Sequence, residues 1–350
     1  MDSVTQLALG ASVAAVCVPA KHRRRALVVG AALGTLPDLD VMIDYGNAVA
    51  NFTLHRGFSH SLVILIPFAV SLWLILRRCY MPVREAPKPW FWAVMLALIT
   101  HPLLDAHTAY GTQLFWPLAV TPTMWSTLFI IDPLYTLPLL VAVIVVLLAP
   151  IRAFAKTALK TGLIVSCLYL SWSWVAKLLV VGAVAERFDT TGEELKVFTT
   201  PTPFNTLMWR IVVMGTDSYQ EGYYHFLRSD SMSFSSFDRG QGLFEQAKHV
   251  PDVQQLEWFA DGFNRADVIE EQLVITDLRM GFEGHYVFQH PVAEIQSGQW
   301  QAVISPRLPS SLGSDDLSIF WDKFTGNEHP TADLCLFRES TGRCLNAVDP

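Results

Sequence analysis

The first 185 residues contain six apolar runs separated by short polar connections. The runs are Val4–Ala20, Ala26–Leu36, Ser61–Leu76, Trp90–Thr100, Leu128–Pro150 and Gly162–Val184. The last two reach the ~20 residues that a helix needs to cross a bilayer, whereas the second extends only about 17 Å, roughly half of the hydrocarbon core. The pattern predicts an α-helical polytopic membrane domain of about five to six membrane segments over residues 1–185, in which Ala26–Leu36 is re-entrant or broken.

After residue 185 the pattern changes. A linker over residues 186–208, rich in Thr, leads to segments of β-branched and aromatic residues such as "RIVVMGT", "SYQEGYYHF", "VITDLRMG" and "HYVFQH". These segments are typical of strands, and "PDVQQLEWFADGF" is typical of a short helix that begins at Pro251. Residues 209–350 are therefore predicted to form a smaller soluble α+β domain.

The net charge of −7 is divided unevenly along the chain. Residues 1–185 carry 13 Lys and Arg against 7 Asp and Glu, a balance of +6, and residues 186–350 carry 12 against 25, a balance of −13. At 51% hydrophobic residues, the chain is too apolar for an ordinary soluble domain. We infer a basic membrane domain joined to an acidic soluble domain, with the lipid bilayer as a partner and no nucleic acid.

The basic residues of the membrane half predict its orientation. Most of them fall in three clusters, Lys21–Arg25, Arg77–Lys88 and Arg152–Lys160. The positive-inside rule makes these clusters cytoplasmic, so six passes place both termini and the acidic domain outside the cytoplasm. In that oxidising compartment, Cys335 and Cys344 are spaced for a small loop-closing disulfide.

Nine ionisable side chains lie in or beside the segments that are predicted to face outward. They are Asp38, Asp40, Asp44, His55, His60, His101, Asp105, His107 and Asp132. Ionisable groups near lipid are energetically costly and usually serve a function. Their convergence on one side of the membrane indicates a functional site, with polar packing between helices as the alternative.

Two short motifs bring carboxylates toward this site. In "HPLLD", His101 and Asp105 are four residues apart and share one helix face, so that both can bind one ion. In "LPDLD", Asp38 and Asp40 are expected to project the same way from an extended turn that starts at the proline.

A third motif, "HRGFSH", supplies two histidines that are five residues apart. They cannot share a face of a continuous helix, but Gly57 allows a break in the chain. Ser59 is then expected to N-cap a helix that begins at His60, which leaves His55 in the preceding loop.

Histidine and carboxylate ligands without cysteine favour a catalytic transition metal over a structural zinc. The predicted metal is Zn²⁺, with Mn²⁺ or Fe as alternatives. Six candidate ligands are enough for two metals with a bridging water. They are Asp38, Asp40, His55, His60, His101 and Asp105.

Arg56 and Asp132 are the candidate catalytic residues outside the ligand set. Arg56 can neutralise a phosphate or another developing anion, or it can form a salt bridge, for example with Asp44. Asp132 is expected to accept a hydrogen bond that supports a neighbouring helix. His107 lies off the helix face of Asp105 and is disfavoured as a ligand.

The segments "GTLPDLD", "HRGFSHS" and "HPLLDAHTAYGTQLFWP" resemble the motifs of the bacterial membrane-bound metal-dependent hydrolases, the YdjM-like group of LexA-regulated inner-membrane proteins. The resemblance covers roughly the first half of the chain, and Ser59 stands where the family pattern has threonine. It implies a multi-pass protein of the bacterial inner membrane with metal ligands in all three motifs. It does not identify a reaction.

Three functions are compatible with these features. The first is a metal-dependent hydrolase at the outer membrane face that acts on an ester or phosphoester of an amphiphilic or lipid-linked substrate. The second, a lipid phosphatase with a histidine nucleophile, is disfavoured because position 95 is Met where that pattern needs Arg. The third is a non-enzymatic, metal-stabilised scaffold or regulator whose acidic domain binds a partner.

Overall fold

The computed structural model describes residues 1–188, 196–228, 232–282, 285–306, 337–338 and 344–345. It divides into two compact units, each described here by itself. The helical unit comprises Met1–Ile43, Arg56–Ala176 and Pro203–Asn205. The β-rich unit comprises Asp44–His55, Lys177–Thr202 and the chain from Thr206 onward. The predicted Cys335–Cys344 pairing lies outside the described residues.

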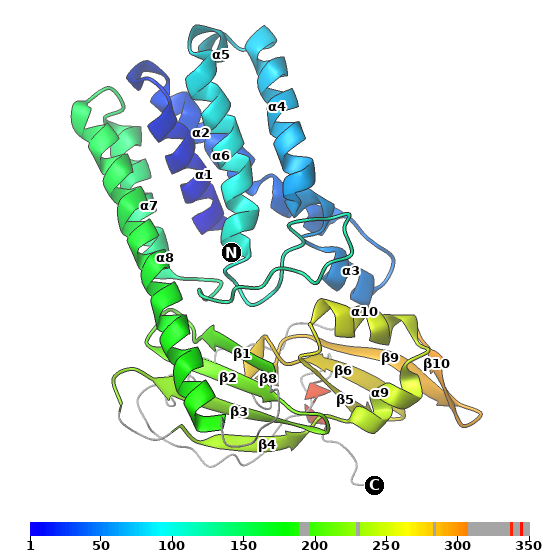
Figure 1. Ribbon diagram of the computed structural model, residues 1–350. Helices are drawn as coiled ribbons and strands as arrows, with labels where there is room; N and C mark the ends of the chain where they lie inside the picture. The colour runs from blue at the N-terminus through cyan, green and yellow to red at the C-terminus, as the bar shows by residue number, and fades with distance from the viewer. Residues whose placement is uncertain (189–195, 229–231, 283–284, 307–336, 339–343, 346–350) are drawn as a thin grey trace. The chain divides into compact units, whose positions relative to one another are not determined.

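The helical unit consists of α-helices joined by short 3₁₀ turns and by one long loop after α6 (Figure 1). The α-helices are α1 (Ser3–Cys17), α2 (Arg23–Thr35), α4 (Leu62–Cys79), α5 (Met81–Glu85), α6 (Pro87–Asp105), α7 (Pro133–Leu148) and the first part of α8 (Ala153–Phe188). The 3₁₀ turns are η1 (Ala20–His22), η2 (Pro37–Met42) and η3 (Phe58–His60).

Helices α1 and α6 form the centre of this unit. Helix α1 packs against α2, α6 and α7, and α6 also packs against α4. Side chains such as Val94, Leu98, Leu128 and Leu139 are fully buried in the shared apolar core. This packing brings the end of α6 beside the start of α1 and the end of α2, where the polar motifs lie.

The prediction of five to six membrane segments is wrong. Within the described residues, two helices are long and apolar enough to cross a membrane, Leu62–Cys79 (α4) and Ala153–Phe188 (α8). Helices α1 and α7 have 15 and 16 residues, so at 1.5 Å per residue they extend about 22–24 Å of the ~30 Å hydrocarbon core. Helix α2 is shorter still and begins with three arginines, and α6 carries Lys88 at one end and Asp105 at the other.

The β-rich unit contains two four-stranded antiparallel sheets. The first has the order β1-β2-β3-β4, and the second has the order β10-β9-β6-β5. The strands of the first sheet are β1 (Lys196–Pro201), β2 (Met208–Met214), β3 (Ser218–His225) and β4 (Phe234–Asp238). Those of the second are β5 (Asn264–Ile269), β6 (Gln272–Asp277), β9 (Gln289–Gln296) and β10 (Gln299–Ala302).

The remaining elements of this unit are short. They are the helices α9 (Gln241–Ala247) and α10 (Pro251–Phe259) and the strand pairs β7 (Gly281–Phe282) with β8 (His285–Tyr286) and β11 (Phe337–Arg338) with β12 (Cys344–Leu345). The helix predicted at Pro251 is α10, and the strands predicted over "RIVVMGT" and "SYQEGYYHF" are β2 and β3.

Helix α3 (Ala48–Leu54), although it lies early in the chain, packs within the β-rich unit. Its Phe52 ring contacts the rings of Phe259 and His290, at centroid distances of 4.8 and 5.1 Å. Burial lowers the pKa of His290 to about 4, so this imidazole is neutral at physiological pH. These contacts are those of a packed core and indicate no metal ligand.

Candidate metal centre

The first polar motif follows α2 in the turn η2. Pro37 stands at the start of this turn, where its fixed φ and missing N–H are tolerated. The prediction of an extended turn is wrong, because Pro37–Met42 is a 3₁₀ helix. With three residues per turn, the side chains of Asp38 and Asp40 leave the backbone in different directions.

The second motif forms a strained bend before α4. Arg56 has a positive φ of 60°, and Phe58–His60 forms the 3₁₀ turn η3. Ser61, and not Ser59, caps α4, since the Ser61 Oγ accepts a hydrogen bond from the Val63 N–H at 3.2 Å. The predicted cap at Ser59 is therefore wrong, and His60 lies in the turn that leads into α4.

The third motif is the last turn of α6. His101 and Asp105 lie on one face of this helix, as their spacing predicts, with the His101 Nε2 3.5 Å from the Asp105 Oδ2. Both side chains are completely buried. Pro102 stands between them inside the helix.

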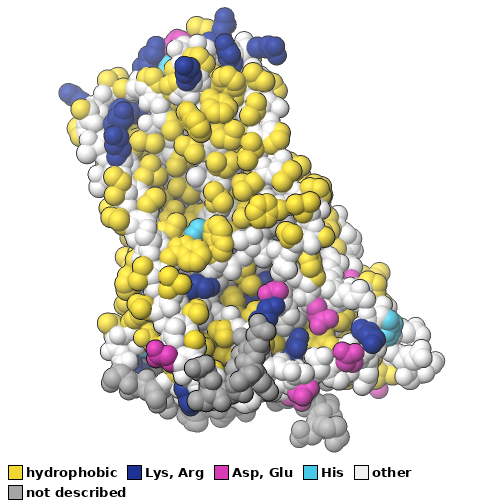
Figure 2. All heavy atoms as spheres, in the orientation of Figure 1, with side chains coloured by type: hydrophobic (Ala, Val, Ile, Leu, Met, Phe, Trp, Pro, Cys, Tyr) yellow, Lys and Arg dark blue, Asp and Glu magenta, His cyan; other side chains and the backbone are white. Residues whose placement is uncertain are grey.

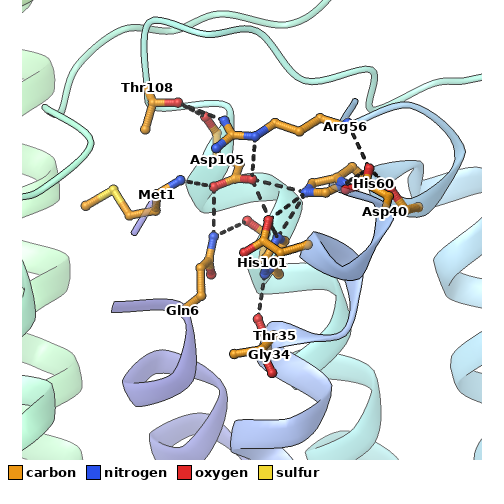
Figure 3. A network of polar contacts seen from close by, with 12 residues as sticks. Met1, Gln6, Gly34, Thr35, Asp40, Arg56, His60, His101, Asp105 and Thr108 are labelled. Atoms are coloured by element: carbon orange, nitrogen blue, oxygen red, sulfur yellow. Dashed lines mark hydrogen bonds and ion pairs between the residues drawn. The ribbon is translucent and has the colours of Figure 1, made fainter. Parts of the chain in front are cut away.

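The three motifs meet in one cluster of four side chains (Figure 3). Asp38, His60, His101 and Asp105 each offer one ligand atom, and all four atoms lie within 4.8 Å of one another. The two Nε2 atoms, of His60 and His101, are 3.0 Å apart. The Asp38 Oδ1 is 3.5 Å from the His60 Nε2 and 3.3 Å from that of His101, and the Asp105 Oδ2 is 3.2 Å from the His60 Nε2.

These separations fit a divalent transition metal. An ion with four ligand bonds of about 2.0–2.2 Å in tetrahedral geometry has ligand atoms about 3.3–3.6 Å apart. Five of the six separations between the ligand atoms are 3.0 to 3.5 Å and need adjustments of only a few tenths of an ångström, and all six lie within 4.8 Å. Two imidazoles and two carboxylates are also the donor set expected for such an ion.

Both imidazoles are held with Nε2 toward the cluster. The His101 Nδ1 donates its N–H to the Gly34 carbonyl oxygen at 2.6 Å, which leaves Nε2 as the nitrogen that would bind a metal. On His60, the Nδ1 lies 2.9 Å from the Ser59 Oγ and 3.6 Å from the Asp40 Oδ2. These partners orient both rings for metal binding.

Two of the six candidate ligands lie outside this cluster. The Asp40 Oδ2 accepts hydrogen bonds from the Arg56 N–H at 2.9 Å and from the Ser59 hydroxyl at 2.5 Å. Asp40 therefore joins the bend of the second motif to η2 and stands behind the His60 ring. His55 ends helix α3 and groups with the β-rich unit.

Arg56 places a buried positive charge beside the cluster. Its Nε is 3.2 Å from the Asp105 Oδ2, its Nη1 donates to the Thr108 hydroxyl at 3.1 Å, and its guanidinium lies over the Tyr110 ring. The predicted alternative partner, Asp44, instead accepts hydrogen bonds from the Gly46 N–H and the Asn51 amide.

Asp132 and His107 have structural contacts. Asp132 caps α7, accepting hydrogen bonds from the Leu134 N–H at 3.0 Å and from the Tyr169 hydroxyl at 2.9 Å. The His107 Nδ1 donates to the Leu103 carbonyl oxygen at 2.8 Å, and its Nε2 accepts from the Trp174 indole at 3.3 Å. Both His107 ring nitrogens are thus occupied by partners other than the cluster.

The electrostatics of Asp38 follow from its neighbours. Burial by itself would raise the pKa of this carboxyl, but hydrogen bonds to His101 and His60 outweigh it and hold the pKa well below its usual range. Asp38 is therefore a carboxylate at neutral pH, the form that binds a cation.

Comparison with known proteins identifies the family. Residues 1–180 match the model of the YdjM inner membrane protein family. The chain belongs to this family. The match covers all three motifs and confirms the resemblance that they indicated.

Two curated relatives of this family member align over shorter stretches. Uncharacterized protein YfhP of Bacillus subtilis (strain 168) is 28% identical over 124 residues, which are 33% of this chain and 37% of YfhP. Inner membrane protein YbcI of Escherichia coli (strain K12) is 34% identical over 93 residues, which are 26% of this chain and 52% of YbcI. The aligned stretches thus cover about a third of the length of YfhP and about half of the length of YbcI. No solved structure matches it significantly.

Sequence reasoning missed several residues that support the cluster. The Gln6 amide donates to the Asp105 Oδ1 at 2.9 Å and to the His101 carbonyl oxygen at 3.2 Å. The amino group of Met1 also forms an ion pair with Asp105. Gly34 contributes the carbonyl oxygen that orients His101. A signal for this last contact exists in "GAALG", whose glycines are four apart and allow close helix approach.

The glycines set the distance between α1 and α2. A Cβ built on Gly30 would lie 2.2 Å from the Gly10 carbonyl oxygen, and one on Gly34 would lie 2.6 Å from the Gln6 carbonyl oxygen. Backbone atoms cannot move aside as a flexible side chain can, so a larger residue would separate the helices. The Gly34 carbonyl and the Gln6 side chain would then leave His101 and Asp105.

We therefore expect Gly30→Ala to destabilise the protein by about 1–3 kcal/mol, because it overpacks the contact between α1 and α2. It should also lower the metal content of the purified protein, because the Gly34 carbonyl, which orients His101, moves with α2. Thermal unfolding and metal content of the detergent-purified protein measure both effects.

Gly182→Ala is the matched control, because nothing lies within 4 Å of a Cβ at that helical position. It should leave metal content unchanged and stabilise α8 by up to about 1 kcal/mol. A Gly30 variant that unfolds at the wild-type temperature with full metal content would contradict the role assigned to this helix contact.

Proposed function

We propose that this YdjM family member is a metal-dependent hydrolase of esters or phosphoesters. The observation that carries the proposal is the cluster of two imidazoles and two carboxylates, in which each imidazole Nε2 lies 3.0 to 3.5 Å from the other three ligand atoms. Structural zinc sites usually include cysteine, whereas hydrolytic sites use histidine and carboxylate ligands. Zn²⁺ is the preferred ion, and Mn²⁺ or Fe²⁺ are alternatives.

Some residues of the site would bind the metal, and others would hold these ligands in position. Asp38, His60, His101 and Asp105 would hold the metal, which supplies Lewis acidity to polarise an ester and to make water a stronger nucleophile at neutral pH. The other groups of the chain keep this arrangement fixed. The Gly34 carbonyl and the Ser59–Asp40 pair hold the two rings, and Gln6 holds Asp105.

Arg56 is the candidate for stabilising negative charge that develops on the substrate. It is buried, with 4% of its surface exposed, and its guanidinium is fixed between Asp105, Thr108 and Tyr110. A charge held in this way needs no reorganisation when an anion forms beside it. Asp132 has no part in the proposed reaction, because its carboxylate caps α7.

The full-length protein, purified in detergent, tests the proposal directly. Elemental analysis should find about one transition-metal ion per chain, and the protein should cleave at least one of p-nitrophenyl acetate, p-nitrophenyl phosphate and bis(p-nitrophenyl) phosphate. Chelation should abolish cleavage, and added Zn²⁺, Mn²⁺ or Fe²⁺ should restore it. Bound metal without cleavage of any reporter would favour the non-enzymatic scaffold.

We further propose that the cluster faces the extracytoplasmic side of the membrane. His60 lies just before the start of α4, and Arg77 and Arg78 lie in its last turn. On α8, Lys156 and Lys160 lie near the start, away from the end that leads to the β-rich unit. The positive-inside rule favours the basic ends in the cytoplasm.

Alkaline phosphatase fusions test this orientation, because the enzyme folds only in an oxidising compartment. A fusion after Phe188 should be active, and a fusion after Arg84 should be roughly tenfold less active at equal expression, since the basic residues retain that end in the cytoplasm. Green fluorescent protein at the same two positions should give the reverse pattern. Activity at Arg84 alone would reverse the proposed orientation.

A further inference from the structure

Exposed apolar side chains cover the end of the helical unit that carries the cluster. We call them the apolar rim, and they are Leu39, Met42, Phe58, Phe115, Trp116 and Leu118. Their exposed fractions run from 36% for Trp116 to 80% for Met42. They come from η2, from η3 and from the loop after α6, the segments that hold or adjoin the ligands.

The rim is tied directly to the cluster. Leu39 stands between Asp38 and Asp40 in η2, and Phe58 opens the turn η3 that carries His60. The Phe58 and Trp116 rings meet edge to face at 6.3 Å. The Ser61 hydroxyl donates to the Trp116 carbonyl oxygen at 2.6 Å, so the loop after α6 is fastened to the start of α4.

The rim continues into the apolar face of a candidate membrane span. Helix α4 begins two residues after His60, and its first turns expose Val63, Ile64 and Ile66. Its 18 residues extend about 27 Å, close to the ~30 Å of the hydrocarbon core. If α4 crosses the bilayer, the rim lies at the boundary between hydrocarbon and headgroups, where tryptophan is enriched.

The charge distribution also favours lipid over a protein or nucleic-acid partner. All Lys and Arg of the helical unit except Arg56 belong to the three basic clusters. Figure 2 shows Lys and Arg side chains gathered at one end of the helical unit, beyond a broad hydrophobic band. Because Arg56 is buried, the rim offers apolar contact and no exposed basic charge of its own unit.

Asp38 is the most exposed residue of the cluster. His60, His101 and Asp105 have completely buried side chains, whereas the Asp38 side chain is 23% exposed. Asp38 is therefore the ligand that an incoming group meets first. Its neighbour Leu39 belongs to the apolar rim, so the exposed ligand Asp38 is directly adjacent to exposed apolar surface.

We propose that the apolar rim lies in the bilayer boundary and that the cluster acts on a membrane lipid whose polar head reaches it from that boundary. This inference rests on the proposed hydrolase function. A lipid has the matching chemistry, because its acyl chains remain against Phe58, Phe115 and Leu118 while its ester or phosphoester reaches Asp38 and the metal. A water-soluble ester would gain nothing from the rim.

The position of the rim is measured with spin labels on the full-length protein in phospholipid vesicles. Met42→Cys and Leu118→Cys carry the label in a protein whose native cysteines are replaced by serine. Both labels should collide more with oxygen, which concentrates in the bilayer, than with a water-soluble nickel chelate. Lys248→Cys, on the exposed surface of the β-rich unit, should show the opposite preference. Rim labels that collide mainly with the nickel chelate would overturn the proposal.

The substrate is tested in vesicles of bacterial polar lipid extract. Zinc-loaded wild-type protein should convert at least one lipid to a hydrolysis product detected by mass spectrometry, and His101→Gln should not. Leu118→Glu should slow this conversion by roughly tenfold, because a charge at the boundary disfavours contact with lipid. It should leave cleavage of the most active soluble p-nitrophenyl reporter within about twofold, since Leu118 is 63% exposed and is not one of the four ligands.

The outcomes separate this inference from the proposed function. Cleavage of a soluble reporter without loss of any lipid would overturn the lipid substrate and leave the hydrolase intact. If the protein cleaves neither the soluble reporter nor any lipid, the proposed hydrolase function is overturned. Equal effects of Leu118→Glu on lipid and on reporter would show that the substitution damages the site, and would remove the rim from the argument for lipid.

Discussion

His101→Gln should release the bound metal and lower hydrolysis by roughly 10³-fold or more, because a first ligand of the metal is lost. The His101 Nε2 lies within 3.5 Å of ligand atoms from His60, Asp38 and Asp105, so it contacts every other member of the cluster. Glutamine keeps much of the volume and can still donate to the Gly34 carbonyl oxygen. Metal content, thermal unfolding and reporter cleavage are measured on the same preparation.

His107→Gln is the matched control for this substitution. His107 lies two residues beyond the end of α6, but it packs against Trp125 and Trp174 and bonds to the Leu103 carbonyl oxygen. The variant should keep its metal and most of its activity, with some loss of stability. If His101→Gln retains metal and full activity, the cluster is polar packing and the proposed function fails.

Substitution of Asp105 gives a less decisive test of the proposed metal site, although Asp105 lies on the same face of α6 as His101. Its carboxylate accepts from Gln6 and pairs with Arg56, and both partners are buried. Asp105→Asn therefore removes a ligand and also leaves Arg56 without its counter-ion, which destabilises the fold. Loss of activity in that variant would not separate the two causes.

Asp38→Asn and Asp40→Asn should have unequal effects on metal affinity. Asp38 contributes a ligand atom, so its substitution should weaken Zn²⁺ binding by roughly 10²-fold or more. Asp40 stands behind His60 and holds the bend through the Arg56 N–H and Ser59, so its substitution should weaken binding by about 10–100-fold. Competition with a chromogenic chelator measures both affinities.

The comparison also decides between two roles for Asp40. Its place in the first motif predicts a ligand, and the structure places it against His60 and Ser59. Ser59→Ala removes one hydrogen bond to Asp40 and should weaken metal binding in the same direction as Asp40→Asn, by a smaller factor. An Asp40 variant that loses metal as completely as the Asp38 variant would make Asp40 a ligand.

Local spacing was sufficient for part of the site. A helix repeats every 3.6 residues, so the four-residue spacing of His101 and Asp105 places them on one face whatever surrounds the helix. The cost of ionisable groups among apolar runs likewise marks the three motifs as one functional region. The same motifs indicated the family, which the match over residues 1–180 confirms.

Membrane crossing could not be judged from apolar runs alone. The run Leu128–Pro150 looks long enough in the sequence, yet its helix α7 has only 16 residues. Helix ends depend on capping and on local turns, such as the Asp132 cap of α7. The count of two candidate spans follows from those ends.

The sequence by itself thus determined the helix-face pair, the three motifs and their donor chemistry. Only the tertiary structure decided which donors meet. The 3₁₀ form of η2 turns Asp38 toward the cluster and Asp40 behind His60, and His55, the residue after helix α3, belongs to the β-rich unit. The contact of the Gly34 carbonyl with His101 joins residues 67 positions apart, through helices that glycines allow to approach. Such distances depend on the packing of whole helices, which no local spacing encodes.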